Sequence, residues 1–165
     1  MINKWNIKFD EDMTTPPNEI VEDYCENLKA LTDGKIVAKI ADYSVPISSY
    51  SRSMSSSIIE VDIQDDLGPS KYFSFEFFIT STSTPNYKYR IMFIRYEIEH
   101  YPLLIVLDGE IATYLNKAQE IWCKDEEEFK IVLQRIVESP KVRKVINNLY
   151  RIGKKDEQRR LLVAE

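Results

Sequence analysis

Glycine, cysteine and histidine are scarce in this chain, and each shortage removes a class of chemistry. Four glycines among 165 residues provide neither a P-loop nor a GxGxxG turn, the motifs that hold phosphate through backbone N–H groups. Cys25 and Cys123 form no CxxC pair and stand beside apolar residues, which predicts two reduced thiols in the core. HExxH, EF-hand and GxSxG motifs are absent too, so the sequence predicts no cofactor and no metal of the familiar motif classes.

Long apolar runs and an excess of positive charge are also lacking. The longest apolar stretch, residues 103–107, is far shorter than the ~20 residues of a membrane span, and the N-terminus has no apolar run of signal-peptide length. We therefore expect a cytoplasmic protein that does not enter a membrane. The chain has 22 Lys and Arg residues against 27 Asp and Glu residues, a net charge of −5. Because phosphate contacts need concentrated cations, this balance disfavours nucleic acid as a partner.

Apolar residues recur at helical spacing in four segments. The first predicted helix follows two prolines and ends near Gly34, a residue suited to the left-handed conformation. An acidic capping box from Asp125 to Glu128 opens the third. Ser139–Pro140 starts the last, Gly153 stops it, and an exposed tail follows. The predicted helices span residues 19–31, 111–115, 125–137 and 140–153.

Two-residue alternation of apolar and polar side chains predicts the strands. Because the strands are grouped between helices, the fold class is α+β, with an antiparallel sheet of about five strands, an N-terminal helix and two to three C-terminal helices packed on it. No repeat or charged linker divides the sequence, so we expect one domain over residues 1–165, with residues 1–17 and 154–165 peripheral. The predicted strands span residues 36–40, 59–64, 72–80, 87–98 and 103–107, and residues 121–123 form a short extended piece.

Strict alternation along residues 87–98 decides which side chains share a face of that strand. It assigns Ile91 and Met92 to opposite faces. Lys88 and Arg90 share one face, and Arg95 lies on the other. We expect Lys88 and Arg90 either to form ion pairs with acids of a neighbouring strand or to bind a carboxylate or phosphate group.

Carboxylates supply the candidate catalytic residues. Glu60 and Asp62 project from one face of their predicted strand, and with Glu76 on the next they provide oxygens of the kind that bind a divalent cation. His100, flanked by acids, is the candidate general base. Nucleases of the restriction-endonuclease type resemble this arrangement but place a Lys two residues after the second acid, where this chain has Phe78. A solvated sheet face and a turn histidine are the alternative interpretations.

Aromatic residues are more numerous than a sheet covered on one face requires. There are 10 Tyr, 7 Phe and 2 Trp residues, so either helices cover both faces of the sheet or one face meets another protein. The second reading predicts a homodimer or a partner complex formed through the sheet. A third reading is a small-ligand pocket between sheet and helices, lined by Tyr72, Tyr89 and Tyr96.

A strand leading to Tyr101–Pro102, the acidic cap before Phe129 and the Ser139–Pro140 break occur together in residues 96–149. In these features the C-terminal half resembles a group of small bacterial proteins with no assigned activity. The resemblance covers about a third of the chain. It implies a bacterial cytosolic setting and carries no catalytic residue across.

The sequence favours a non-enzymatic protein-binding or regulatory, accessory domain of bacterial type. The missing catalytic motifs, the acidic charge, the small size and the aromatic excess all support this reading. The alternatives are a metal-dependent hydrolase or nuclease-like enzyme that uses the strand carboxylates, and a small-ligand-binding domain.

Overall fold

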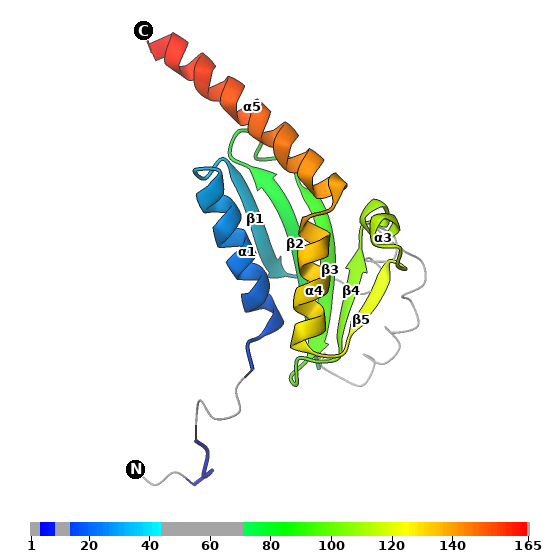
Figure 1. Ribbon diagram of the computed structural model, residues 1–165. Helices are drawn as coiled ribbons and strands as arrows, with labels where there is room; N and C mark the ends of the chain where they lie inside the picture. Colours follow the sequence, from blue (N-terminus) through cyan, green and yellow to red (C-terminus); the bar gives the residue numbers. More distant parts are fainter. Residues whose placement is uncertain (1–3, 9–13, 44–70, 165) are drawn as a thin grey trace.

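The computed structural model describes residues 4–8, 14–43 and 71–164 of the chain (Figure 1). The predicted strand at residues 59–64 lies outside them, and so do the candidate carboxylates Glu60 and Asp62. The described residues form an N-terminal helix, a five-stranded antiparallel sheet and C-terminal helices. This arrangement confirms the predicted α+β class.

Every strand of the sheet pairs with its neighbour in the chain, so the strand order is β1-β2-β3-β4-β5 and every pair is antiparallel. The predicted strands at residues 72–80 and 87–98 form the pair β2 and β3 at the centre. The short extended piece predicted at residues 121–123 joins the sheet as its edge strand. The strands are β1 (Ile36–Asp42), β2 (Tyr72–Ser81), β3 (Tyr89–Glu97), β4 (Leu103–Leu107) and β5 (Glu120–Cys123).

A β-bulge in β3 changes which side chains share a face. Phe77 pairs with Met92 and Phe78 pairs with Arg90, so Ile91 is an extra residue on β3. An extra residue of this kind reverses the alternation beyond it, and Ile91 and Met92 both enter the same core cluster. The prediction that these two side chains point to opposite faces is therefore wrong.

The bulge also brings Arg95 to the face that carries Arg90. In register, Arg90 is opposite Phe78 and Arg95 is opposite Ser74, and residues 74 and 78 of one strand lie on the same side. The prediction that Arg95 lies on the other face is wrong for the same reason. This shared face is the one that the described helices leave uncovered.

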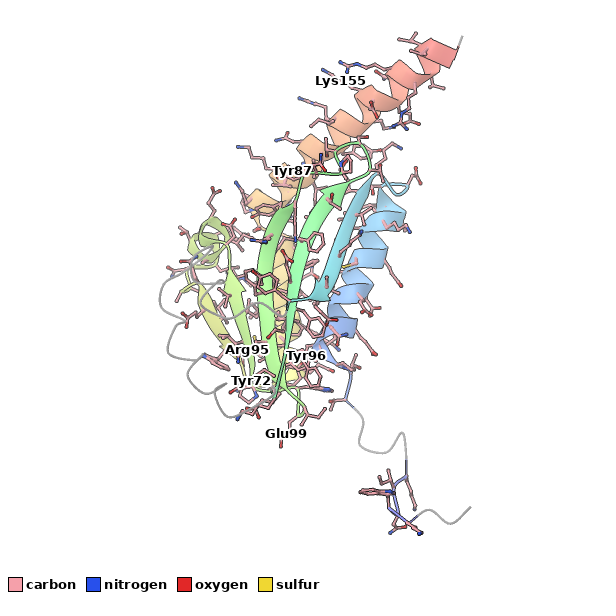
Figure 2. All side chains as sticks on the ribbon, turned by 180° about the vertical axis from the view of Figure 1, so that it is seen from behind. Tyr72, Tyr87, Arg95, Tyr96, Glu99 and Lys155 are labelled. Carbon is pink, nitrogen blue, oxygen red and sulfur yellow. The ribbon has the colours of Figure 1, made fainter. Side chains whose placement is uncertain are left out.

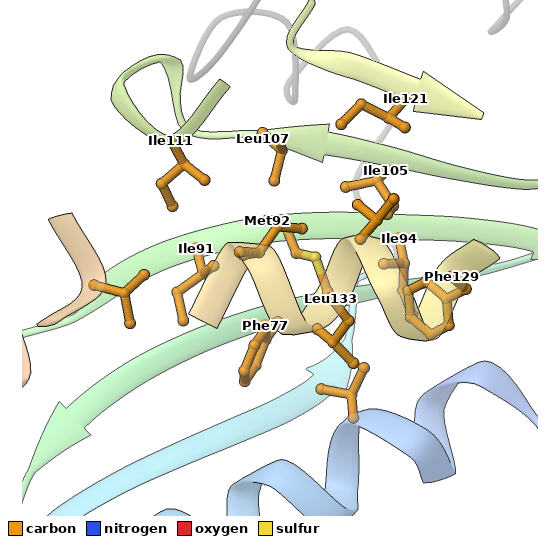
Figure 3. Close-up of a cluster of buried hydrophobic side chains, with 14 of the residues drawn as sticks. Phe77, Ile91, Met92, Ile94, Ile105, Leu107, Ile111, Ile121, Phe129 and Leu133 are labelled. Carbon is orange, nitrogen blue, oxygen red and sulfur yellow. The ribbon is translucent and has the colours of Figure 1, made fainter. Parts of the chain in front are cut away.

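Three helices cover the other face of the sheet: α1 (Pro17–Leu31), α4 (Glu126–Val137) and the first half of α5 (Pro140–Ala164) (Figures 1 and 2). In the core between the layers, Phe129 and Leu133 of α4 pack toward Phe77, Met92 and Ile94 of the strands (Figure 3). Each of these side chains is 2% exposed or less, and burial of one such side chain contributes about 1.5–3 kcal/mol. The short helix α3 (Gly109–Leu115) contacts α4 and α5.

The predicted start and stop signals of α1 and α4 act as expected. Pro17 is the first residue of α1. Past its end, Gly34 adopts φ +77° and its N–H donates to the Lys29 carbonyl at 2.8 Å. At α4, Asp125 Oδ1 accepts a hydrogen bond from the N–H of Glu128 at 2.8 Å, which satisfies one of the unpaired donors of the first turn.

The last helix contradicts one prediction, because Gly153 does not end it. α5 begins at Pro140 and continues through Gly153 to Ala164. Gly153 is buried where the helix crosses the strand ends, with side-chain atoms of Lys35 and Ser83 within 4 Å of the position a Cβ would take. Close approach to the sheet, rather than helix termination, accounts for the glycine. The last turns of α5 project beyond the sheet (Figure 1).

Candidate binding site

A pocket of about 190 Å³ opens at the end of the sheet where β3 turns into β4. We call it the end pocket. Figure 2 shows Tyr72, Arg95, Tyr96 and Glu99 gathered at this end of the sheet, with Tyr87 and Lys155 at the opposite end. Among the described residues, the pocket is lined by Tyr72, Arg95, Tyr96, Glu97, Glu99, Tyr101, Pro102 and Trp122.

Strand register explains why these residues meet. Arg95 of β3 is in register with Leu104 of β4, and Leu104 is in register with Trp122 of β5. Side chains in one cross-strand row project from the same face, so Arg95 and Trp122 flank the buried Leu104. Tyr72 comes from the other neighbour of β3, where it is in register with Glu97.

The inner wall of the end pocket is a cation–π stack. The guanidinium carbon of Arg95 lies 3.9 Å from the centroid of the Tyr72 ring. Arg95 is 4% exposed, so its charge sits where solvent screens it little, and a desolvated stack of this kind is worth ~2 kcal/mol. The contact fixes the position of the Tyr72 ring in the wall of the pocket.

The rim of the end pocket carries large apolar side chains that face solvent. Trp122 is 52% exposed although it belongs to a strand. Ile98, between the two pocket-lining residues Glu97 and Glu99, is 73% exposed. Phe73, which is 42% exposed, points to the opposite face of β2 from its neighbour Tyr72 and packs on the Tyr96 ring. Exposed apolar residues in one place mark interaction sites more often than isolated ones do.

His100 lies in the turn behind the end pocket, as the alternative interpretation of that residue expects. Its backbone has φ +75°, and a cis Tyr101–Pro102 bond follows. Its Nδ1 shares a 2.7 Å hydrogen bond with Thr14 Oγ1, and its ring meets the Tyr96 ring edge-on, with centroids 5.7 Å apart. These contacts join the turn to the segment that precedes α1.

Glu76 is held by the two cations predicted to share a face. Its carboxylate is 5% exposed and accepts from Lys88 Nζ at 2.8 Å and from Arg90 Nε at 2.6 Å. The Lys88 ammonium also lies over the Phe78 ring, 4.4 Å from the centroid. These contacts show that Lys88 and Arg90 form cross-strand ion pairs, which is one of the two roles predicted for them.

Tyr89 and Tyr96, two of the predicted binding residues, place their hydroxyl groups in contacts between elements. Tyr89 donates to Asp108 Oδ2 at 2.8 Å, and burial together with this hydrogen bond raises its pKa. Tyr96 donates to Asn18 Oδ1 at 2.9 Å, and burial raises its pKa to about 12. Of the predicted trio of tyrosines, Tyr72 and Tyr96 line the end pocket, whereas Tyr89 is not among its lining residues.

The candidate catalytic residues do not converge among the residues that the structure describes. Glu76 is opposite Phe93 in the middle of β3, whereas His100 follows the end of that strand. In the described ranges, no three His, Cys, Asp or Glu side chains are grouped so that they could hold a metal ion. Glu60 and Asp62 lie outside those ranges, so the metal hypothesis remains a prediction.

Sequence reasoning missed most of the end pocket. Glu97, Glu99, Tyr101 and Trp122 reach it through the β3–β4 turn and the β4–β5 pairing. The exposed Trp in the segment Glu120–Cys123, between the buried Ile121 and Cys123, is the signal that could have been used. Alternation places Trp122 on the face opposite Ile121 and Cys123, which belong to the core cluster.

The comparisons with known proteins add no relative. No family model, curated protein or solved structure matches this chain. The resemblance of residues 96–149 to small bacterial proteins therefore stays a prediction. In the part of the chain that the structure describes, none of the helices combines the length and apolar composition that crossing a bilayer requires.

Proposed function

We propose that this chain is a non-enzymatic binding domain that recognises a protein partner through the end pocket and its apolar rim. The observation that carries the proposal is Trp122, which stands 52% exposed beside a pocket walled by Tyr72 and Arg95. About half of the Trp122 surface is open to solvent on β5, the edge strand of the described sheet. Its ring is free to enter an interface.

The residue types around the end pocket support a protein partner. Trp, Tyr and Arg dominate the energetics of protein–protein interfaces, and they cluster at the centre of the contact. Tyr72, Arg95 and Trp122 meet here, and the Arg95–Tyr72 stack holds two of them in place before any partner arrives. A preorganised surface loses less side-chain entropy on binding.

The size of the end pocket favours a partner's side chain over a small molecule. Ligand pockets are typically about 300–1,000 Å³, whereas this pocket measures about 190 Å³. A second pocket, of about 160 Å³, lies between the sheet and the helices α1, α4 and α5, and it is lined mainly by apolar residues such as Leu28, Phe77 and Val142. Neither volume suits a cofactor or a drug-sized ligand. We infer that one large side chain of a partner enters the end pocket while the rim covers its neighbours.

The test compares Trp122→Ala with Tyr114→Ala as immobilised baits in a native-host lysate. Tyr114 is a matched control because it is 50% exposed and lies on α3, beyond the far end of β4. We expect wild type and Tyr114→Ala to retain the same stoichiometric partner and Trp122→Ala to lose it. With purified partner, truncation of the Trp should weaken binding by at least about 2 kcal/mol, some thirtyfold.

Light scattering of the purified chain separates a foreign partner from self-association. A wild-type dimer that Trp122→Ala converts to a monomer would identify the partner as a second copy of the chain. A wild-type monomer that captures no stoichiometric partner would contradict the proposal, and so would a partner that Trp122→Ala binds as tightly as Tyr114→Ala does.

A further inference from the structure

Acidic and basic residues are unevenly distributed along the chain, and α5 carries an excess of basic residues. This helix contains eight of the 22 Lys and Arg residues but two of the 27 Asp and Glu residues, a net charge of +6 in a chain of net charge −5. The rest of the chain therefore has 14 basic against 25 acidic residues. The prediction against nucleic acid used the net charge of the whole chain, which averages over this separation.

Between Arg143 and Arg159, one side of α5 displays only cationic and amide side chains, and the exposed Leu161 and Leu162 follow on the same side at the end of the helix. An α-helix repeats every 3.6 residues, so steps of three and four residues follow one side. From Lys144 those steps lead through Asn148, Arg151 and Lys155 to Arg159. Further cationic and amide side chains lie beside this row. All are exposed. This basic stripe comprises Arg143, Lys144, Asn147, Asn148, Arg151, Lys154, Lys155, Gln158 and Arg159.

Both acidic residues of α5 lie off the basic stripe and are paired there. Asp156 Oδ2 lies 3.2 Å from the Arg160 guanidinium, and Glu157 Oε2 lies 3.4 Å from Lys35 Nζ. In contrast, none of the six stripe cations has a salt bridge to another described residue. Their charge is therefore available to an external anion.

The shape of α5 suits a long, regularly charged ligand. The basic stripe extends over about 24 Å, since a helix rises 1.5 Å per residue, and the end of the helix projects beyond the sheet (Figure 1). Residues on the opposite side, Val142, Leu149 and Gly153, are buried against the rest of the protein. The packed side fixes the helix, so the basic stripe always points outward.

We propose that the basic stripe binds the phosphate backbone of double-stranded DNA. Duplex DNA carries one negative charge per ~1.7 Å of axis, which a row of cations can follow. Its major groove, ~12 Å wide, admits an α-helix, whereas the corresponding groove of duplex RNA is too deep and narrow. Asn and Gln side chains, interleaved with the cations, can hydrogen-bond to phosphates and to base edges.

The composition of α5 argues against an acidic protein surface and against an anionic membrane as the partner of the basic stripe. Protein interfaces are depleted in Lys and need an apolar or aromatic centre. The exposed Leu161 and Leu162 lie past the end of the basic stripe, so they do not provide a centre for it. A helix that lies on an anionic membrane needs a free apolar face along its length. Val142 and Leu149 are buried against the rest of the protein, and the exposed Leu161, Leu162 and Val163 are confined to the last turn of α5, beyond the basic stripe. This site is separate from the end pocket, so either proposal can fail without the other.

Fluorescence anisotropy with a labelled duplex DNA of about 20 base pairs, at about 50 mM KCl, tests the proposal. The stripe variant is Lys144→Gln/Arg151→Gln/Lys155→Gln. The control is Lys29→Gln/Lys117→Gln/Lys124→Gln, which removes three exposed lysines that lie off the stripe. Both variants lose three positive charges and so have the same net charge.

We expect wild type and the control to bind with affinities within about twofold of each other and the stripe variant to bind at least tenfold more weakly. If each removed cation contacts one phosphate, the slope of log K against log salt becomes less steep by up to ~2.7. Three results would overturn the proposal: no binding by wild type, equal loss in the two variants, or tighter binding to duplex RNA or to phosphatidylserine vesicles than to the DNA. Circular dichroism establishes that both variants are folded.

Discussion

The guanidinium carbon of Arg95 lies 3.9 Å from the centroid of the Tyr72 ring, and both residues line the end pocket. They come from neighbouring strands, and Arg95 reaches this face only because the bulge in β3 shifts the alternation. One extra residue in a strand therefore places the charged wall of the pocket beside its aromatic wall. The stack links the local geometry of β3 to the proposed binding surface.

The Arg95–Tyr72 stack should be measurable as a coupling energy. Lys at position 95 keeps the charge but loses the planar group that stacks on a ring, and Tyr72→Leu removes the ring. We expect a double-mutant cycle of Arg95→Lys and Tyr72→Leu, followed by urea unfolding, to give a coupling of ~1–2 kcal/mol. Tyr72→Phe, which retains the ring, serves as the control and should preserve most of the coupling. Additive losses in the cycle would show that the contact contributes nothing.

The ion pairs of Glu76 predict an asymmetric response to mutation. Lys88 and Arg90 are 40% and 37% exposed, whereas the Glu76 carboxylate is 5% exposed. Removing the acid by Glu76→Gln leaves two cations that water can solvate, so we expect a loss of about 1 kcal/mol. Removing both cations by Lys88→Met/Arg90→Met leaves an unpaired buried carboxylate, which should cost about 3–5 kcal/mol.

A triple variant checks the origin of that asymmetry. Adding Glu76→Gln to Lys88→Met/Arg90→Met removes the buried charge, so it should recover most of the lost stability in urea unfolding. If the triple variant is less stable than the double variant, the carboxylate is stabilising without its cations and the explanation is wrong.

Local signals in the sequence predicted the elements better than they predicted the faces of the sheet. Gly34 and the Asp125 cap act through contacts within a few residues, so their effect is visible in the sequence alone. The bulge at Ile91 depends on pairing with a different strand, and nothing in the alternation of residues 87–98 reveals it. The same limit applies to the end pocket. Tyr72 and Tyr96 were predicted from composition, but Trp122 joins them only through the register of three strands.

Gly153→Ala should stabilise the protein, contrary to the helix stop that the sequence suggested. The residue lies inside α5 without a positive φ, and an added Cβ would meet Ser83 Oγ at 3.6 Å and Lys35 Cδ at 3.7 Å, ordinary contact distances. Ala in a helix interior gains about 0.5–1 kcal/mol over Gly because the unfolded chain loses freedom. A higher midpoint of thermal unfolding would verify this. A lower midpoint would mean that the helix does not continue through residue 153 in solution.

The two thiols, Cys123 buried and Cys25 partly buried, should make stability fall at alkaline pH. Burial raises the pKa of Cys123 from its ordinary 9.0 to about 12, and burial and Glu22 raise that of Cys25 to about 11. A folded-state pKa above the unfolded value favours the native state fully below the unfolded pKa, and this contribution is lost as the pH rises through the folded pKa. The fully buried Cys123 should therefore reduce the unfolding free energy by up to ~1.4 kcal/mol per pH unit above about pH 9, and the partly buried Cys25 by less, because solvent screens its charge.

Cys123→Ala isolates one of these contributions, because alanine does not titrate. The variant leaves a small cavity at a fully buried position and should be less stable than wild type at pH 7. Between about pH 9 and 11 the Cys123 thiol stays protonated in the folded wild type but ionises in the unfolded chain, which favours unfolding of the wild type alone. In urea unfolding, the difference in unfolding free energy between the two proteins should therefore shrink over this range. Lysine and tyrosine titrations affect both proteins alike, so they cancel in the comparison. A difference that stays constant across this range would show that Cys123 ionises as easily in the folded protein as in the unfolded chain, and it would place the thiol in contact with water instead of in the core.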